Sequence, residues 1–179
     1  MSLIMVDIES GGPCPGLYPM IEIGAWHVTP NITNGFSVEI IPDPDNFHPD
    51  TMKAMNWTQE ILYNRPYSVS PIEAMKRFEN FILQAQGQPI FISDNNGFDW
   101  QFVNYYFWRY IGRNPFGFSS MNLGQLYKGL RQDIRQSFRH LRKTKHTHKA
   151  IDDALGNTEA LLQIHKDFPC LFKNQIRDF

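Results

Sequence analysis

The sequence Met5-Val6-Asp7-Ile8-Glu9-Ser10 ends a short apolar run, which begins at Leu3, with two carboxylates. If the run is a β-strand, Asp7 and Glu9 point to the same face, because side chains alternate along a strand. Two carboxylates on one face repel each other unless a cation lies between them, and oxygen ligands of this kind suit Mg²⁺ or Mn²⁺. A solvated strand end is the alternative, and an isolated Asp-x-Glu favours it. Acidic sites further along the chain shift the balance toward a metal site.

Strands are expected in five segments, at residues 3–8, 20–28, 36–41, 89–93 and 116–120. The first three follow one another closely, and Asn34-Gly35 is a strong signal for a tight turn, so an antiparallel meander is predicted. The fourth is a compact apolar run between two helical patterns, which is typical of a buried strand. The last two are expected to be parallel strands.

Helices are expected at residues 50–57, 58–63, 70–86, 98–110 and 151–168, and from residue 122 onward. The clearest start is Ser70, because a proline follows it and Glu73 completes a capping box. The apolar stripe of that helix is Ile72, Met75, Phe78 and Ile82. Hairpin strands followed by alternating helices and strands predict an α/β fold, with a mixed five-stranded sheet flanked by helices.

Composition sets the limits of the interpretation. The 179 residues are enough for one domain, assigned to residues 1–179, and 42% of them are hydrophobic. No apolar run reaches the ~18 residues of a membrane span and the N-terminus lacks a secretory signal, so no membrane partner is expected. Cys14 and Cys170 are interpreted as thiols of a reducing, cytoplasmic compartment. With a net charge of −1, any attraction for nucleic acid must come from local patches.

A second acidic site, Asp94-Asn95-Asn96-Gly97-Phe98-Asp99, follows the apolar segment 89–93. Asp99 falls in the first turn of the next helix and shares an otherwise apolar face with Phe102 and Tyr106. It either complements the helix dipole or acts as a metal ligand at the inner edge of the helix.

A third site, His146-Thr147-His148-Lys149-Ala150-Ile151-Asp152-Asp153, joins a basic connector to the last helix. One of the two aspartates can point inward from the first turns of that helix. His148 lies just before the helix, where a loop histidine can approach a substrate. A lone histidine in a basic loop is usually an exposed bystander, and its spacing to Asp153 argues for a site.

Together the three sites resemble the DEDDh family of 3′→5′ exonucleases, whose members share the ribonuclease-H-like fold. Order and spacing agree over residues 3 to about 165. The family motifs are matched by Asp7 and Glu9, by residues 21–25, by Asn95, Phe98 and Asp99, and by His148, Ala150, Asp153 and Ala154. Ser10 and Asn96 depart from common residues of the family, but neither departure removes a ligand. Residues 50–57 resemble, in part, the RNase AS-like exoribonuclease branch.

The resemblance implies hydrolysis of phosphodiester bonds from the 3′ end, with release of nucleoside 5′-monophosphates. Asp7, Glu9, Asp99 and Asp153 are expected to hold two Mg²⁺ or Mn²⁺ ions, with Asp7 bridging both. His148 is expected to be the general base for the attacking water, because histidine ordinarily titrates near neutral pH.

Substrate contacts are expected from three sets of residues. Basic residues form a stripe if the segment is helical: Arg131, Arg135, Arg139 and Arg142, continued by Lys143, Lys145 and Lys149. Arg142 and Lys145 are expected to bind phosphates, and a solvated surface is an equal alternative. The stacking candidates are Trp57, Tyr63, Trp100 and Tyr106, with Trp57 preferred and core packing as the alternative. Close contacts to the terminal nucleotide are expected from Ser10, Gly11 and Asn95.

The predicted partners are the 3′ ends of single-stranded RNA or DNA, with RNA slightly favoured, and the monophosphate product. The alternatives are a DNA exonuclease, a catalytically silent nucleotide- or RNA-binding module, and a structural partner in a nuclease complex. A silent site would be expected to lose at least one ligand, whereas all four carboxylates and the histidine are present. By analogy with relatives, a homodimer through the aromatic-rich segment 100–118 is also expected.

Overall fold

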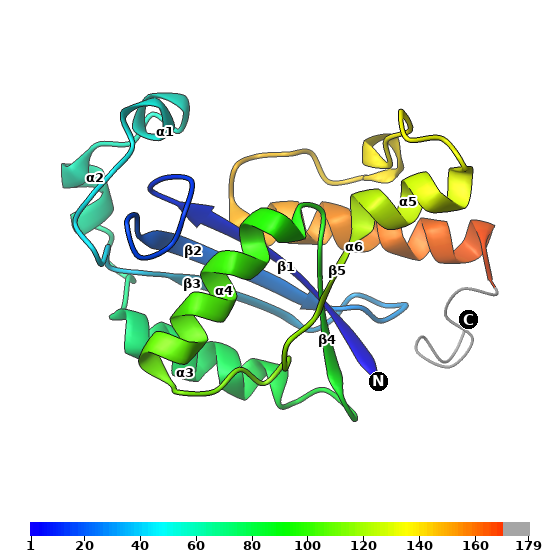
Figure 1. The fold of residues 1–179 in the computed structure, drawn as a ribbon, viewed down its shortest axis with the longest axis horizontal. Coiled ribbons are helices and arrows are strands. Elements are labelled where there is room, and N and C mark those ends of the chain that lie inside the picture. Colours follow the sequence, from blue (N-terminus) through cyan, green and yellow to red (C-terminus); the bar gives the residue numbers. More distant parts are fainter. Residues whose placement is uncertain (170–179) are drawn as a thin grey trace.

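A five-stranded sheet with the order β3-β2-β1-β4-β5 lies at the centre of the computed structural model, which describes residues 1–169 (Figure 1). The strands are β1 (Ser2–Ser10), β2 (Met20–His27), β3 (Gly35–Glu39), β4 (Pro89–Ser93) and β5 (Ser120–Asn122). β1, β2 and β3 pair antiparallel, whereas β4 is parallel to β1 and β5 is parallel to β4. The predicted mixed sheet, a meander followed by parallel strands, is confirmed.

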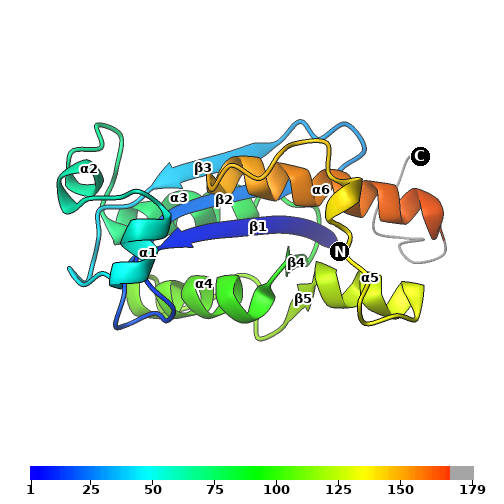
Figure 2. The same cartoon turned by 90° about the horizontal axis from the view of Figure 1, so that it is seen from above.

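Helices cover both faces of the sheet, and Figure 2 shows α4 and α6 on opposite sides of β1. The helices are α1 (Pro49–Ala54), α2 (Gln59–Tyr63), α3 (Pro71–Ile82), α4 (Asn96–Tyr110), α5 (Leu123–Arg131) and α6 (Ala150–Asp167), with a short 3₁₀ helix, η1, at Arg139–Leu141. α1 and α2 lie beyond the C-terminal end of β1 (Figure 1).

The alternation of β1 decides which way its carboxylates point. Ile4, Val6 and Ile8 belong to the apolar core shared with α3 and α4. Leu3 and Met5 belong to the core shared with α5 and α6. Because side chains alternate, the next odd-numbered residues, Asp7 and Glu9, face the side of α6.

Polar caps begin three of the helices where the sequence predicts. The Ser70 hydroxyl accepts a hydrogen bond from the Glu73 N–H at 3.4 Å, and the Thr58 hydroxyl accepts one from the Ile61 N–H at 3.1 Å. The Asn122 side chain accepts one from the Gln125 N–H at 2.7 Å. These starts depend on residues within one turn, so they can be predicted from local sequence.

Two helical predictions are wrong at their C-terminal ends. α1 ends at Ala54 instead of residue 57, because Asn56 has a φ of 52° in the left-handed region, and α3 ends at Ile82 instead of residue 86. α5, for which the sequence predicted no end, stops at Arg131 because Gln132 has a φ of 53°, so the basic segment does not form the helix on which a stripe would lie. Only η1 is helical between α5 and α6.

Two further predictions need correction. β5 lies at residues 120–122 instead of 116–120, because Gly117 turns with a φ of 79° and Phe116 packs into the core against Phe91. Ile72, expected in the apolar stripe of α3, is 44% exposed, whereas Phe78 is fully buried.

Cys14 is a free cysteine, and Cys170 lies outside the described residues. In residues 1–169 no helix has both the length and the apolar character needed to cross a membrane.

Candidate active site

Three of the predicted carboxylates meet where β1 faces α6. Asp7 and Glu9 come from β1, and Asp153 comes from the first turn of α6. One oxygen from each of the three lies within 4.8 Å of the others, which is close enough to share one metal ion. Asp153 is buried, whereas Asp7 and Glu9 are half-buried and accessible to an ion from solvent.

Asp99 joins this cluster from the first turn of α4. Its Oδ1 accepts a hydrogen bond from the backbone N–H of Ile8 at 3.2 Å, so the carboxylate lies against β1 next to Asp7. Its Oδ2 is buried and makes no close hydrogen bond, and the Ser93 side chain beside the carboxyl group lowers its pKa against the effect of burial. A buried carboxylate oxygen that is poorly paired is costly, and a cation satisfies it directly.

The electrostatics of the cluster fit a cation site. Burial raises the pKa of Asp7 well above its usual range, and the charges of Asp99 and Glu9 raise it further. Burial together with the nearby acids Glu22 and Asp153 raises the pKa of Glu9 to about 8. Burial raises the pKa of Asp99 to about 7. Carboxylates that repel one another in this way are stabilised as anions by a divalent ion.

Asp153 is held by four residues of the connector that precedes α6, namely Arg142, His146, Thr147 and His148. Arg142 donates from Nη2 to Oδ1 at 2.7 Å, and His146 Nδ1 lies 2.7 Å from the same oxygen. Arg142 is 8% exposed, so its guanidinium is part of the site and does not lie on an open basic stripe. The backbone N–H of His148 donates to Oδ2 of Asp153 at 3.1 Å.

His148 is fixed through its backbone and leaves its ring exposed. Its φ of 55° lies in the left-handed region, where few residues other than glycine are found. Its ring packs edge-on against His146, with the ring centroids 4.2 Å apart. Residues held in such backbone conformations cluster at functional sites.

A family profile described as RNase_T, an exonuclease, matches residues 4–161. This chain is a DEDDh-type exonuclease of that family. It is 31% identical over 161 residues to the 3′-5′ DNA exonuclease Cap18 of Escherichia coli, covering 88% of this chain and 83% of that relative.

Solved structures share the fold of this exonuclease. The nuclease domain of 3′hExo, a DEDDh family member bound to rAMP, has a TM-score of 0.74 and 14% identity, over 93% of this chain and 92% of that one. The E. coli exonuclease I complex with single-stranded DNA has a TM-score of 0.74 and 18% identity. That match covers 96% of this chain but only 42% of exonuclease I. The predicted ribonuclease-H-like fold is confirmed by these likenesses.

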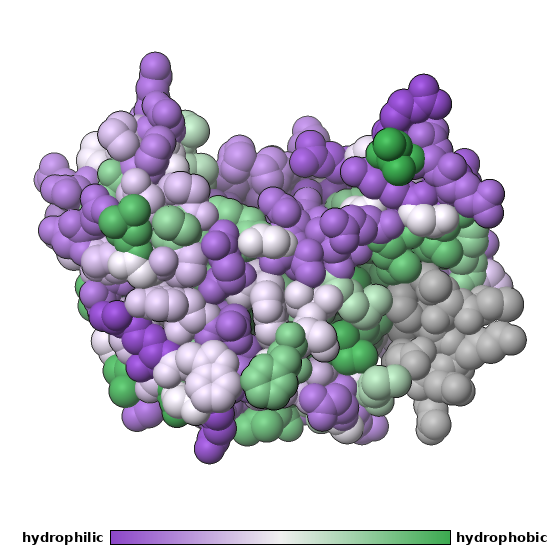
Figure 3. All heavy atoms as spheres, in the orientation of Figure 1, coloured by the Kyte–Doolittle hydropathy of each residue, from purple (hydrophilic) through white to green (hydrophobic). Residues whose placement is uncertain are grey.

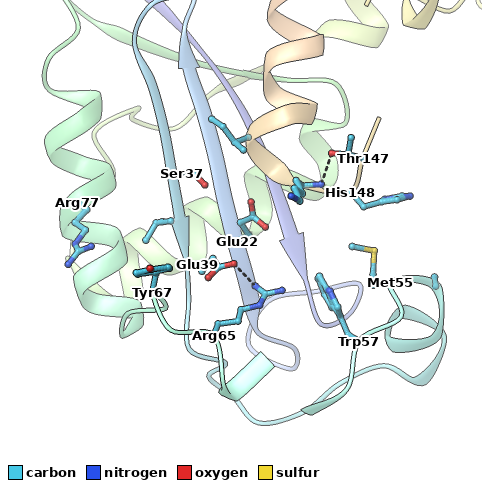
Figure 4. A pocket seen from close by; sticks show the side chains of 14 residues that line it. Glu22, Ser37, Glu39, Met55, Trp57, Arg65, Tyr67, Arg77, Thr147 and His148 are labelled. Carbon is cyan, nitrogen blue, oxygen red and sulfur yellow. Dashed lines mark hydrogen bonds and ion pairs between the residues drawn. The ribbon is translucent and has the colours of Figure 1, made fainter. Parts of the chain in front are cut away.

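A hollow of about 710 Å³ in this exonuclease lies beside His148 (Figure 4). Trp57 and Arg65 line it, and the Arg65 guanidinium lies 5.5 Å from the centre of the Trp57 ring. Glu22 also lines this hollow, and sequence reasoning did not single it out.

A second hollow, of about 380 Å³, lies on the Glu9 side of the cluster and is also lined by Ser10, Gly12 and Phe98. Ser10 donates its hydroxyl proton to the Gly12 carbonyl at 2.7 Å. The Gly11 N–H donates to the Pro19 carbonyl at 2.8 Å and its carbonyl accepts from the His48 N–H at 2.7 Å. Gly12 lines the hollow, and the contact expected from Gly11 stays a prediction.

Basic residues line a third hollow, of about 290 Å³, next to Asp94. They are Arg139, Arg142, Lys143, Lys145 and His146. Asn95 lines a neighbouring hollow of about 480 Å³ that also contains Asp94. Figure 3 shows hydrophilic residues along the edge between α1 and the turn after α5, where the surface is hollowed.

Two of the stacking candidates belong to the core. The Tyr106 hydroxyl accepts from the Met20 N–H at 2.7 Å and donates to the Asp43 carbonyl at 2.8 Å, and its ring is 1% exposed. Trp100 packs edge-on against Phe91, at 5.1 Å between ring centroids. Tyr63 is exposed on α2 but lines none of the hollows described above.

Sequence reasoning missed the two basic partners of Asp153. Nothing in the spacing of Arg142 and His146 relative to Asp153 marks them, because their positions depend on the path of an irregular connector. It also did not assign a role to Asp94, which lies near Arg139, Arg142 and His146; burial raises its pKa and these cations oppose that rise.

Proposed function

We propose that this exonuclease removes nucleoside 5′-monophosphates from the 3′ end of single-stranded nucleic acid, using Mg²⁺ or Mn²⁺. The observation that carries the proposal is the cluster in which Asp7, Glu9 and Asp153 bring oxygens within 4.8 Å of one another. Asp99 adds a fourth carboxylate with a buried, poorly paired oxygen. These four residues would hold a pair of ions, which supply a nucleophile at neutral pH and stabilise the charge of the leaving oxygen.

The residues of the chain supply the rest of the reaction. His148 accepts a proton from the attacking water, because its ring is exposed beside the cluster while Asp153 fixes its backbone. Arg142 compensates the charge of Asp153 at 2.7 Å, and His146 Nδ1 lies 2.7 Å from the same oxygen, so both residues keep this carboxylate oriented toward Asp7 and Glu9.

The hollows beside the cluster suggest where the strand binds. The hollow at Ser10, Gly12 and Phe98 accommodates the terminal nucleoside, since it borders Glu9 directly. Lys145 lines the basic hollow, where it can bind a phosphate, and Asn95 lines the hollow next to it. Trp57 offers a ring for base stacking beside His148.

RNA is the substrate expected from the resemblance to exoribonucleases. DNA is the second candidate, because the E. coli relative with 31% identity is named a DNA exonuclease. A contact to the ribose 2′-hydroxyl is what would separate the two. Self-association stays a prediction from sequence, and on the segment expected to mediate it Trp108 and Phe118 are 49% and 89% exposed. Cytoplasmic location likewise stays a prediction.

A side-by-side digestion tests the activity. Single-stranded RNA and DNA of identical sequence, labelled at the 5′ end, are incubated with Mg²⁺, Mn²⁺ or EDTA. The expected result is a ladder shortened from the 3′ end that requires the metal and is lost in Asp7→Ala, and the rate ratio of the two strands decides between the candidates. A metal-dependent ladder is not expected of a silent binding module or of a structural partner, so its absence on both strands would contradict the proposal.

The variant His148→Ala tests the proposed base. Turnover is expected to fall by about 100-fold or more, because proton transfer by a positioned side chain contributes at least that much. Binding of the monophosphate product, measured by calorimetry, should remain near the wild-type value. A His140→Ala variant, exposed on η1 and outside the lining of the hollows described above, serves as a matched control for loss of an imidazole. Unchanged turnover in His148→Ala would remove the role.

A further inference from the structure

One face of β2 packs against the first turn of α6. Glu22, Gly24 and Trp26 alternate along the strand and therefore point the same way. All three contact the backbone of Ala150 or Ile151, the first two residues of α6. We propose that Glu22 is a positioning residue, which holds this turn so that His148 and Asp153 keep the arrangement that the reaction needs. The proposal rests on the proposed function.

Gly24 allows the closest approach of the two elements. A Cβ at this position would overlap the backbone of Ala150 and Ile151. That overlap is with main-chain atoms, which cannot move aside as the end of a flexible side chain can. The helix therefore begins directly on the strand, with no side chain between them.

Trp26 and Glu22 add one hydrogen bond on either side of this contact. The Trp26 indole donates from Nε1 to the Ile151 carbonyl at 3.1 Å. The Glu22 carboxylate accepts a hydrogen bond from the backbone N–H of Ala150. This N–H belongs to the first turn of α6 and has no partner within the helix, so an acceptor from outside satisfies it. Figure 4 shows Glu22 between β2 and the start of α6.

Hydrogen bonds link the first turn of α6 to the residues before it. The N–H groups of Asp152 and Asp153 both donate to the Lys149 carbonyl at 3.0 Å. The Asp153 carboxylate in turn accepts from the N–H groups of Thr147 and His148, at 3.3 Å and 3.1 Å. A shift at Ala150 is therefore transmitted both to the carboxylate of Asp153 and to the ring of His148.

The place of Glu22 in the sheet argues that it serves the site. Glu22 lies directly opposite Glu9 in the register of β1 and β2, so two acids are paired across the strands. Like charges placed opposite each other destabilise a sheet. Arg65 offsets part of this repulsion, since its charge acts on both Glu9 and Glu22. Glu22 is only 9% exposed, and the hydrogen-bond acceptor that its carboxylate provides at the start of α6 explains why an acid occupies this position.

The test compares Glu22→Ala and Glu22→Gln with Glu79→Ala as the matched control. Glu79 is as buried as Glu22, at 8% exposure, but it lies on α3, pairs with Arg113 at 2.8 Å and lines none of the hollows described above. Glu22→Ala is expected to lower kcat by tenfold or more while KM for a single-stranded oligonucleotide changes less than twofold. Glu22→Gln should recover most of kcat, because its amide oxygen can accept the same N–H. Glu79→Ala should keep wild-type kcat.

Amide hydrogen exchange of residues 147–153 supplies a readout that needs no activity. Glu22→Ala should speed exchange in this segment more than in α3, and Glu22→Gln should not. If the Ala variant fails to fold, Trp26→Phe removes the companion hydrogen bond and should show the same selective loss of kcat. Wild-type kcat in Glu22→Ala, a change in KM alone, or equal loss in the Gln variant would each overturn the proposal. An inactive wild-type protein would count against the proposed function, while the exchange result would still judge the role of Glu22.

Discussion

The folded protein disfavours the ionised form of the Glu9 carboxyl group unless a cation is bound beside it. Burial and the neighbouring acids raise its pKa to about 8, from an ordinary value near 4.5. The folded protein therefore holds this proton more tightly than the unfolded chain does. Between those two pH values the folded state binds more protons, so the free energy of unfolding falls as the pH rises. Asp99 and Asp7 are shifted in the same direction.

Urea unfolding in EDTA measures how the free energy of unfolding changes between pH 5 and pH 8. The range is set by the pKa of Glu9, which is raised to about 8. Stability of the wild type should decline across the range, and Glu9→Gln should decline less, because one titrating group is gone. Mg²⁺ or Mn²⁺ at the upper pH should restore wild-type stability, since a ligand of the folded state stabilises it. Glu60→Gln, on exposed α2, should keep the wild-type slope. Parallel slopes for Glu9→Gln and wild type would contradict the assignment.

At the residue scale, strand alternation and helix starts predict where the carboxylates point, and the structure brings oxygens of Asp7, Glu9 and Asp153 within 4.8 Å of one another. The same patterns do not predict the contacts of Arg142 and His146 with Asp153, which depend on an irregular connector. Local patterns predict position along an element, and they do not predict tertiary hydrogen bonds.

Among the elements, α3 shows how far an apolar stripe can be trusted. Phe78 stacks against Phe36 and Phe107, with centroids 5.2 Å and 5.8 Å away, whereas Ile72 near the start of the helix is 44% exposed. Phe78→Ala should lower the free energy of unfolding by about 3–5 kcal/mol, because it leaves a cavity. Ile72→Ala should change it by about 0.5 kcal/mol or less, as surface substitutions do. Thermal and urea unfolding of both variants check this, and similar losses would show that the stripe is buried along its whole length.

Helix starts were predicted better than helix ends. Ser70, Thr58 and Asn122 act as caps within one turn, so their signal is local. The ends of α1 and α5 instead follow left-handed conformations at Asn56 and Gln132, which neither apolar periodicity nor helix-start signals predict. The basic stripe was predicted on the condition that its segment is helical, and Gln132 ends α5 before that segment.

For the whole molecule, charge is distributed unevenly although the net charge is only −1. The metal-ligand candidates gather four acids at one point, and the connector between α5 and α6 brings cations beside them. Such an arrangement can hold divalent ions and the phosphates of a strand in neighbouring places, which a uniformly basic protein would not do. The sequence shows that acidic sites and a basic segment occur in the same chain. It does not show how they are arranged in space, because the cations reach the site through a loop.

The exposed lysines of the connector should set the salt dependence of binding. Lys143 and Lys145 line the basic hollow, and the backbone N–H of Lys143 donates to Glu159 at 2.9 Å. In an Asp7→Ala background, Lys143→Gln and Lys145→Gln should each weaken binding of a labelled single strand at low salt. Each should also reduce the slope of log K against log salt by about 0.7, the value for one phosphate contact on a single strand. Fluorescence anisotropy over a salt series measures both quantities. Lys76→Gln, on the exposed face of α3 across the sheet, is the control and should leave the slope and the affinity unchanged. If both connector variants have the same slope as the wild type, the strand takes another path.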